Sequence, residues 1–424
     1  MADSKNSGPI NSSKPIDISS ANAIRKKATK MEEIFSEEDL ELIELKKRYK
    51  ILNLTQDEIF ETAKQYIKGQ DEALKILIAI IYNNHYLNML EDTNDIVVKH
   101  MSGLVIGPSG SGKSYTLERL AKIFGIPYTR FNATSLTSAG YTGGDVDSII
   151  LAHIKNSGGN IEKAERGILF IDEIDKKVST QAQNTSGRDI NGTAIQEELL
   201  KILEPSIIIV GKDNIPFDTH MLTVICGGRF IGLDQYRDER LNGKKFMGFG
   251  KPTPQAIDKD DEYDDIDVLD KALSDESSPN YIKKDLIKYG FIDEFVGRFT
   301  FITEFHKLAT ETVEDIIYAK GSILQQYLNV FYSRGVDLII DPLVLNQIAE
   351  SVANSDTGAR DIESKILGVL LPAIRDVEQN YCHGICEIDR SLGYTSVFQK
   401  RNSDDLKINV VTSFANRTDL KSNK

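Results

Sequence analysis

The segment from Gly107 to Ser114, which reads Gly-Pro-Ser-Gly-Ser-Gly-Lys-Ser, constrains the fold more than any other part of the sequence. It matches the pattern G-x-x-x-x-G-K-[S/T] at every specified position. A short apolar run at 103–106 precedes it, and apolar residues spaced for one helical face follow over 115–124. This order predicts a strand, a glycine loop and a helix whose N-terminus faces phosphate groups, whereas an unrelated Gly-rich turn would not need the flanking elements.

Each residue type in this motif has a chemical reason to contact a nucleotide. Backbone N–H groups of the loop bind phosphate oxygens, Lys113 reaches the β and γ oxygens as a mobile positive charge, and the Ser114 hydroxyl binds Mg²⁺. The residues expected at the phosphates are Gly107, Pro108, Ser109, Gly110, Ser111, Gly112, Lys113 and Ser114.

A second, acidic motif lies downstream and narrows the class of nucleotide-binding protein. An apolar run at 168–171 precedes Asp172 and Glu173, which puts Asp172 at the carboxyl end of a buried strand, where open α/β sheets bind ligands. Asp172 is expected to hold Mg²⁺ with Ser114, and Glu173 to orient and polarise the attacking water. This acidic pair favours hydrolysis over phosphoryl transfer, so the sequence predicts an enzyme that hydrolyses a nucleotide. A plain strand-end turn is the alternative.

Composition limits the other classes of function. A chain of 424 residues with a formal net charge of −13 has no overall attraction for nucleic acid or an anionic membrane. Residues 1–30 lack the apolar core of a signal peptide, and no apolar stretch is long enough to span a membrane, so a cytoplasmic protein is expected. The three cysteines, Cys226, Cys382 and Cys386, form no zinc-binding pattern, and no zinc is expected.

The pattern along the chain predicts an α/β fold with a second domain. Short apolar runs at 104–106, 128–132, 168–171 and 222–226 alternate with helical patterns, which predicts a parallel sheet covered by helices. Two helices are expected over 57–88, broken at 68–70. The expected parts are a disordered segment 1–30, an accessory helix 31–56, a large domain 57–300 with a mobile acidic insertion 251–280, a small, mostly helical domain 301–390 and a tail 391–424.

The stretch from Tyr66 to Arg360 resembles the ClpX family of AAA+ protein unfoldases, which have a P-loop AAA+ domain followed by a smaller helical domain. Several motifs match in order along the chain. Lys68-Gly69-Gln70, together with Ile67, is similar to the family segment beside the adenine. Two further motifs, Gly140-Tyr141-Thr142-Gly143 and Gly187-Arg188-Asp189-Ile190, are similar to the two axial pore loops. The segment from Phe291 to Arg298 is similar to the arginine-finger segment, and Thr357-Gly358-Ala359-Arg360 is similar to the sensor-2 motif.

The resemblance implies a homohexameric ring with ATP between adjacent subunits. Arg298 would reach the neighbour's γ-phosphate, and Arg360 would couple the small domain to the nucleotide. Tyr141, Thr142 and Arg188 would line the substrate pore, where an aromatic ring between glycines can grip any polypeptide. Taken alone, this tyrosine would instead indicate a surface turn.

A loop at 246–250 resembles the family segment that docks into the ClpP peptidase. Its central residues are Met247, Gly248 and Phe249. Large apolar side chains in an otherwise charged loop favour a partner, although a packed local cluster is the alternative.

Other positions depart from the family pattern. Residues 1–65 contain no cysteine, so the family's N-terminal zinc module is not found there. The connection 204–221 lacks the family's Arg-Lys-His triplet and has Lys212 and His220 as its basic residues. Thr142 stands where valine is usual, and no sensor-1 side chain is evident at Cys226-Gly227-Gly228.

Three functions are therefore open. The first is an ATP-dependent unfoldase that threads proteins through a hexamer pore into a ClpP-type peptidase. The second is a remodelling ATPase that works without a peptidase, favoured by the missing zinc module and the altered entrance. The third, a nucleic-acid motor or loader, is disfavoured by the acidic charge balance.

Overall fold

The computed structural model describes residues 47–94, 100–136, 146–178, 190–242, 281–380, 382–388 and 394–400. Contacts between residues divide the chain after Asn53. Before this point the described residues include a short 3-10 turn, η1 (Lys50–Asn53), and the elements named below belong to residues 54–424. The expected disordered segment 1–30, most of the accessory helix and the acidic insertion 251–280 lie outside the described residues.

A five-stranded sheet forms the centre of the part of the chain that ends with residue 304. Its strands are β1 (Gly103–Ile106), β2 (Tyr128–Asn132), β3 (Ile168–Asp172), β6 (Thr223–Gly228) and β7 (Phe301–Glu304), in the order β2-β3-β6-β1-β7. Every neighbouring pair is parallel. The carboxyl ends of the strands therefore meet at one edge of the sheet, and the predicted helix-covered parallel sheet is confirmed.

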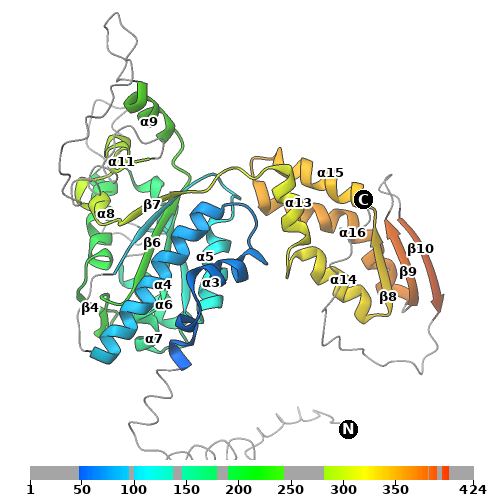
Figure 1. Ribbon diagram of the computed structural model, residues 1–424, viewed down its shortest axis with the longest axis horizontal. Helices are drawn as coiled ribbons and strands as arrows, with labels where there is room; N and C mark the ends of the chain where they lie inside the picture. Colours follow the sequence, from blue (N-terminus) through cyan, green and yellow to red (C-terminus); the bar gives the residue numbers. More distant parts are fainter. Residues whose placement is uncertain are drawn as a thin grey trace, which may run out of the picture. The chain divides into compact units, whose positions relative to one another are not determined.

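Helices cover both faces of this sheet (Figure 1). On one face lie α3 (Gln56–Lys64), α4 (Asp71–Asn94) and α5 (Lys113–Phe124), with Ile80 of α4 close to Gly103 of β1. On the other face, buried side chains of the sheet pack against α6 (Val146–Asn156), α7 (Ile161–Glu165), α8 (Ile190–Leu203), α9 (Leu233–Asn242), α11 (Lys283–Tyr289) and α12 (Asp293–Gly297). In the described part of the chain, no helix is long and apolar enough to cross a membrane.

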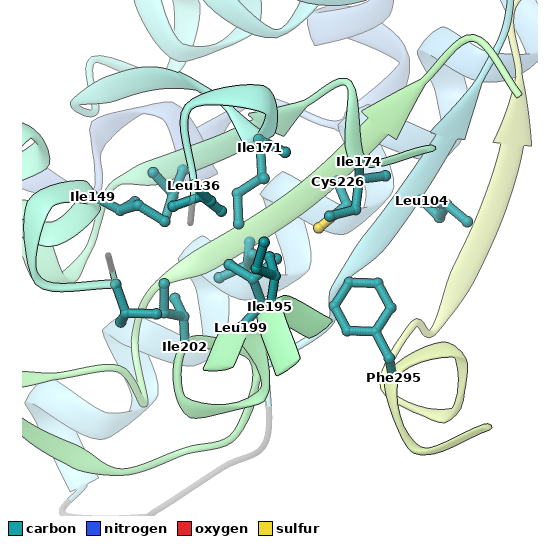
Figure 2. Packing of buried hydrophobic residues seen from close by; sticks show 14 of the residues in the cluster. Leu104, Leu136, Ile149, Ile171, Ile174, Ile195, Leu199, Ile202, Cys226 and Phe295 are labelled. Carbon is teal, nitrogen blue, oxygen red and sulfur yellow. The ribbon is translucent and has the colours of Figure 1, made fainter. Parts of the chain in front are cut away.

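Alternate residues of each strand face this second core, because successive side chains point to opposite faces of a sheet. Figure 2 shows Leu104, Ile171 and Cys226 of three strands close to Ile195 and Phe295 from two helices. All five side chains are almost completely buried. Strands that are buried on both faces read as continuous apolar runs, which is why the sequence marked them clearly.

The strand β7 corrects one expectation. Sequence analysis began the mostly helical second domain at residue 301, but β7 pairs with β1 along its whole length, with Phe301 opposite Gly103 and Glu304 opposite Ile106. Residues 301–304 thus belong to the large sheet. The strand was missed because it is four residues long, lies at the edge of the sheet and is only partly buried.

Shorter elements connect the strands. Single turns of 3-10 helix follow β2 and β3, as η2 (Ala133–Ser135) and η3 (Ile174–Lys177). Between α8 and β6, strands β4 (Ile207–Val210) and β5 (Ile215–Asp218) form an antiparallel hairpin.

A second hydrophobic core lies in the part of the chain after β7. It is formed by α13 (Thr310–Tyr318), α14 (Ile323–Ser333), α15 (Pro342–Ala353) and α16 (Asp361–Asn380), together with β8 (Val336–Ile340) and β9 (Cys382–Ile388). The chain forms two separate helices, α13 and α14, on either side of Gly321, which has a φ angle of +74°.

The C-terminal tail expected over 391–424 also needs correction. Residues Tyr394–Lys400 form strand β10, which pairs antiparallel with β9 in a three-stranded sheet of order β10-β9-β8. The polar residues of this stretch weakened the strand pattern in the sequence. Residues 401–424 lie outside the described part.

Candidate nucleotide-binding site

The phosphate loop connects β1 to α5 at the carboxyl edge of the sheet. Two of its glycines, Gly110 and Gly112, have φ angles of +73° and +100°, which other residues rarely adopt. A side chain at Gly107 would also collide, because its Cβ would lie 2.3 Å from the carbonyl oxygen of Phe305. Glycine is thus required by the backbone at these positions, and the loop leads directly into the N-terminus of α5 at Lys113.

Lys113 lies almost completely buried beneath the loop. Its Nζ donates hydrogen bonds to the carbonyl oxygens of Gly107 at 2.6 Å and Pro108 at 2.9 Å. Burial lowers the pKa of Lys113 to about 8, although the negative charges of Asp172 and Asp175 oppose this shift. A buried ammonium gains from an anionic ligand, so this part of the site fits a phosphate group.

Asp172 ends β3 next to the phosphate loop. It is 5% exposed, and its Oδ2 accepts a hydrogen bond from Ser114 Oγ at 3.4 Å. A hydroxyl and a carboxylate beside phosphate oxygens are the hard oxygen ligands that Mg²⁺ prefers. The two residues predicted to hold the metal are therefore adjacent and fit it chemically.

Glu173 follows with a left-handed backbone, φ +60°. Its backbone N–H donates to Asp172 Oδ1 at 2.9 Å, and its Oε2 accepts from Asn132 Nδ2 at 3.2 Å. Asn132 ends β2 and pairs with Asp172 in the sheet register. Asn132 thus holds the carboxylate expected to orient water, a role that sequence analysis missed. The signal was an amide side chain at the carboxyl end of a predicted strand.

Sequence analysis also missed Arg130, two residues earlier on β2. Its Nε and Nη2 donate to the same Asp172 oxygen, Oδ2, at 3.0 and 2.7 Å. It lines the nucleotide cavity with Arg229, which directly follows β6 at the place where no sensor-1 side chain was evident.

The cavity has a volume of about 580 Å³. Of the predicted residues, it brings together Ile67, Ser109 to Ser114, Asp172, Glu173 and Arg360. Side chains from the second core, such as Ile316 and Ile323, line it as well. Its size and its mixture of apolar and polar walls fit a nucleotide.

The predicted helix break lines one wall of this cavity with Ile67, Lys68 and Gln70. The backbone turns at Gly69 and Gln70, both at positive φ, between α3 and α4. Nearby, the ring of Tyr66 lies 5.1 Å from the guanidinium of Arg119 and 5.3 Å from the ammonium of Lys320. Ile67 is buried. An apolar and aromatic wall of this kind suits a flat base.

The segment predicted as sensor 2 contacts the phosphate loop through the backbone. It forms the short turn η4 (Gly358–Arg360), and the N–H of Ala359 donates to the carbonyl of Gly110 at 3.0 Å. A Cβ at Gly110 would lie 1.9 Å from the carbonyl oxygen of Thr357. Loop and turn thus fit together only with glycine at position 110.

Arg298 is placed elsewhere. It follows α12, forms an ion pair with Glu204 and is not among the described residues that line the cavity. The predicted pore residues Tyr141, Thr142 and Arg188 lie outside the described residues, as do Met247, Gly248 and Phe249 of the predicted docking loop.

Comparison with known proteins agrees with this architecture. Residues 98–302 match the family model described as "AAA domain (Cdc48 subfamily)". The match spans strands β1, β2, β3 and β6 of the parallel sheet, the first two residues of β7, the phosphate loop and the acidic pair. Fold and site together define an AAA+ ATPase, a class that uses ATP with Mg²⁺.

Two relatives identify the family within this class of ATPases. The chain is 34% identical over 333 residues to the ATP-dependent Clp protease ATP-binding subunit ClpX of Treponema denticola, an alignment that covers 76% of each chain. It is 34% identical over 328 residues to the subunit of the same name from Borrelia duttonii, covering 74% of this chain and 71% of the relative. The chain belongs to the ClpX family of AAA+ unfoldase ATPases.

Proposed function

We propose that this chain is an ATP-driven protein unfoldase that works as a homohexameric ring with ATP between adjacent subunits. The observation that carries the proposal is the separation of two sets of residues. One subunit holds Lys113, Asp172 and Glu173 around one cavity, whereas Arg298 lies outside it. An arginine supplied by a neighbour would complete such a site and make hydrolysis depend on assembly.

Within the site, each residue has a proposed task in hydrolysis. The loop N–H groups and Lys113 bind the phosphates, while Ser114 and Asp172 hold Mg²⁺, which neutralises developing phosphate charge when bound. Glu173, held by Asn132, orients the attacking water. Arg360 links the helical part of the chain to the nucleotide, since Asp172 at the carboxyl edge of the sheet and Ile316 of the helical part line the same cavity.

The work done with this energy is proposed to be the threading of protein substrates. Tyr141, Thr142 and Arg188 are proposed to line the axial pore, and Met247, Gly248 and Phe249 to dock a ClpP-type peptidase. Support for the peptidase comes from the relatives, which are named as ATP-binding subunits of the ATP-dependent Clp protease.

Degradation of a tagged fluorescent protein by the chain and a ClpP-type peptidase tests this proposal. Wild type with ATP should abolish the fluorescence, and Tyr141→Ala should prevent this while leaving ATP hydrolysis within about threefold, because Tyr141 is proposed to contact the protein substrate and not the nucleotide. Phe249→Ala should leave unfolding intact and abolish peptidase binding. Degradation by Tyr141→Ala at the wild-type rate would contradict threading by this residue.

A remodelling ATPase that uses no peptidase is the second candidate. Two features favour it: residues 1–65 contain no cysteine for a zinc module, and the hairpin β4–β5 has a short connection between its strands. Pull-down with a ClpP-type peptidase separates the candidates, since binding that requires Phe249 supports degradation and its absence supports remodelling. ATP hydrolysis stimulated by DNA would instead support a nucleic-acid motor, which the net charge of −13 disfavours.

A further inference from the structure

We propose that Arg130 competes with Mg²⁺ for the carboxylate of Asp172, so that binding of a magnesium nucleotide must break an ion pair within the site. The inference rests on the proposed magnesium site at Ser114 and Asp172. It concerns a residue of this chain that neither the phosphate loop nor the acidic motif includes.

Both oxygens of Asp172 already accept hydrogen bonds. Oδ1 accepts the backbone N–H of Glu173 at 2.9 Å. Oδ2 accepts Nε and Nη2 of Arg130 at 3.0 and 2.7 Å, in addition to the longer contact from Ser114 Oγ at 3.4 Å. The guanidinium therefore occupies the oxygen that lies beside Ser114, which is the oxygen that could hold the proposed metal together with the Ser114 hydroxyl.

The two partners of this ion pair differ in their freedom to move. The side chain of Arg130 is 42% exposed, whereas that of Asp172 is 7% exposed. Asp172 is fixed at the end of a central strand and by the Glu173 N–H, while Arg130 lies on β2, the edge strand of the sheet. If the pair breaks, Arg130 is the partner that moves.

Electrostatics sets the direction of the effect. The cations Lys113, Arg130 and Arg360 all line the same cavity. A guanidinium and Mg²⁺ on one carboxylate oxygen would repel each other, so they bind in alternation. A nucleotide without metal carries more negative charge, so Arg130 strengthens its binding. A magnesium nucleotide must displace Arg130 from Asp172, so Arg130 weakens its binding.

These opposite effects give Arg130 a signature that a purely structural residue lacks. Removing its charge should weaken metal-free nucleotide binding and favour the magnesium form. The quantity to measure is the magnesium factor, defined as the dissociation constant in EDTA divided by the dissociation constant in Mg²⁺. General damage to the pocket would weaken both forms and would not raise this factor.

The experiment uses fluorescently labelled ADP and the full chain, and it measures binding by fluorescence anisotropy with EDTA and with Mg²⁺. Wild type is compared with Arg130→Met, which keeps an apolar stem of similar length, and Arg130→Lys, which keeps the charge but has no second N–H branch. Lys122→Met is the control for loss of one positive charge, because Lys122 is an exposed residue of α5 paired with Glu118 and is not among the described cavity residues. Thermal unfolding verifies that each variant is folded.

For Arg130→Met we expect the magnesium factor to rise about tenfold, which corresponds to about 1.4 kcal/mol. The same variant should bind labelled ADP more weakly than wild type in EDTA. Arg130→Lys should give an intermediate factor, and Lys122→Met the wild-type factor.

A factor that stays the same or falls in Arg130→Met would overturn the competition, and a fall would make Arg130 a residue that positions Asp172 for the metal. A wild-type chain that binds no labelled ADP under either condition would overturn the nucleotide site itself. The failure of the inference and the failure of the proposed function are thus distinguishable.

Discussion

Glu173 is the residue whose replacement separates nucleotide binding from hydrolysis. Glutamine keeps an oxygen that can accept the hydrogen bond from Asn132, but it cannot polarise water as a carboxylate does. For Glu173→Gln we expect nucleotide affinity within about threefold of wild type and hydrolysis slower by about 10²–10⁴. Binding of labelled ATP and release of phosphate measure the two quantities. Hydrolysis at the wild-type rate would mean that another group activates the water.

Asn132→Ala is the matched variant at the neighbouring strand end. It leaves the carboxylate in place but removes the amide that holds it. The rate of hydrolysis should fall by about tenfold, less than in Glu173→Gln, because the Glu173 carboxylate can still polarise water but is no longer held in one orientation.

His153 predicts how stability depends on pH. It is fully buried, with Nδ1 2.7 Å from Thr129 Oγ1 and Nε2 2.8 Å from the carbonyl oxygen of Ala164, and burial lowers its pKa from 6.5 to about 4. Between pH 6.5 and about 4, the unfolded chain therefore binds a proton at His153 and the folded chain does not. Stability falls as pH drops through this range, and His153 alone should account for about 2 kcal/mol of the loss between about pH 7.5 and 5.

Urea unfolding at the two pH values tests this expectation. His153→Gln should lose stability less steeply with acid than wild type, whereas His306→Gln, which replaces an exposed histidine, should follow wild type. An unchanged pH dependence in His153→Gln would show that other groups cause the acid sensitivity.

At the scale of elements, one side chain joins three segments around the cavity. The amide of Gln70, at the break between α3 and α4, donates to the carbonyl oxygens of His306 at 2.7 Å and Ser111 at 3.4 Å. Its oxygen accepts the N–H of His306 at 2.9 Å. Gln70 thus connects the helix break, the phosphate loop and the segment between β7 and α13.

Gln70→Ala should weaken nucleotide binding by about three- to tenfold and lower stability by about 1 kcal/mol, because these hydrogen bonds are partly exposed to solvent. Binding of labelled ADP and urea unfolding measure both effects. Gln347→Ala, an exposed substitution on α15, is the control. If Gln70→Ala behaves like this control, the hydrogen bonds do not couple the segments.

The arrangement of the strands explains which parts of the site could be predicted from the sequence alone. The phosphate loop and the pair Asp172 and Glu173 were predictable because their patterns are local and each follows an apolar strand. The roles of Asn132 and Arg130 depend on β2 lying beside β3 in the sheet. That neighbour relation is a property of the folded sheet and leaves no pattern within either segment.

The strands β7, β8 and β10 were missed for a different reason. Each is short, partly exposed or polar, so its own residues give only a weak strand pattern. Each is stabilised by pairing with a neighbouring strand, which the sequence of the segment does not show. The expected domain boundaries stay predictions, although the two hydrophobic cores, one before and one after β7, support the division into a large and a small part.

At the scale of the whole molecule, the proposed ring predicts that two inactive variants rescue each other. Arg298→Ala should lower hydrolysis by about 10³-fold or more, since the arginine acts on the neighbour's phosphate. In a mixture with Glu173→Gln, some sites combine an intact Glu173 from one subunit with an intact Arg298 from the next. An equal mixture should recover about a quarter of the wild-type ATPase rate, because random assembly makes about one site in four complete.

The control for this rescue is a mixture of Glu173→Gln with Lys113→Met, which share the same defective half of the site. These subunits cannot form a complete site in any arrangement, so the mixture should stay inactive. If Arg298→Ala and Glu173→Gln each form a ring but do not rescue each other, Arg298 does not act in the neighbour's ATP site.

The most direct test of the account is the loss of native fluorescence of a tagged green fluorescent protein, measured together with ATP hydrolysis for wild type and Glu173→Gln. We expect wild type to hydrolyse ATP and abolish the fluorescence only when ATP and Mg²⁺ are present, and Glu173→Gln to bind ATP and leave the substrate folded. Unfolding by Glu173→Gln at the wild-type rate would contradict the claim that hydrolysis at this site drives the unfolding of proteins.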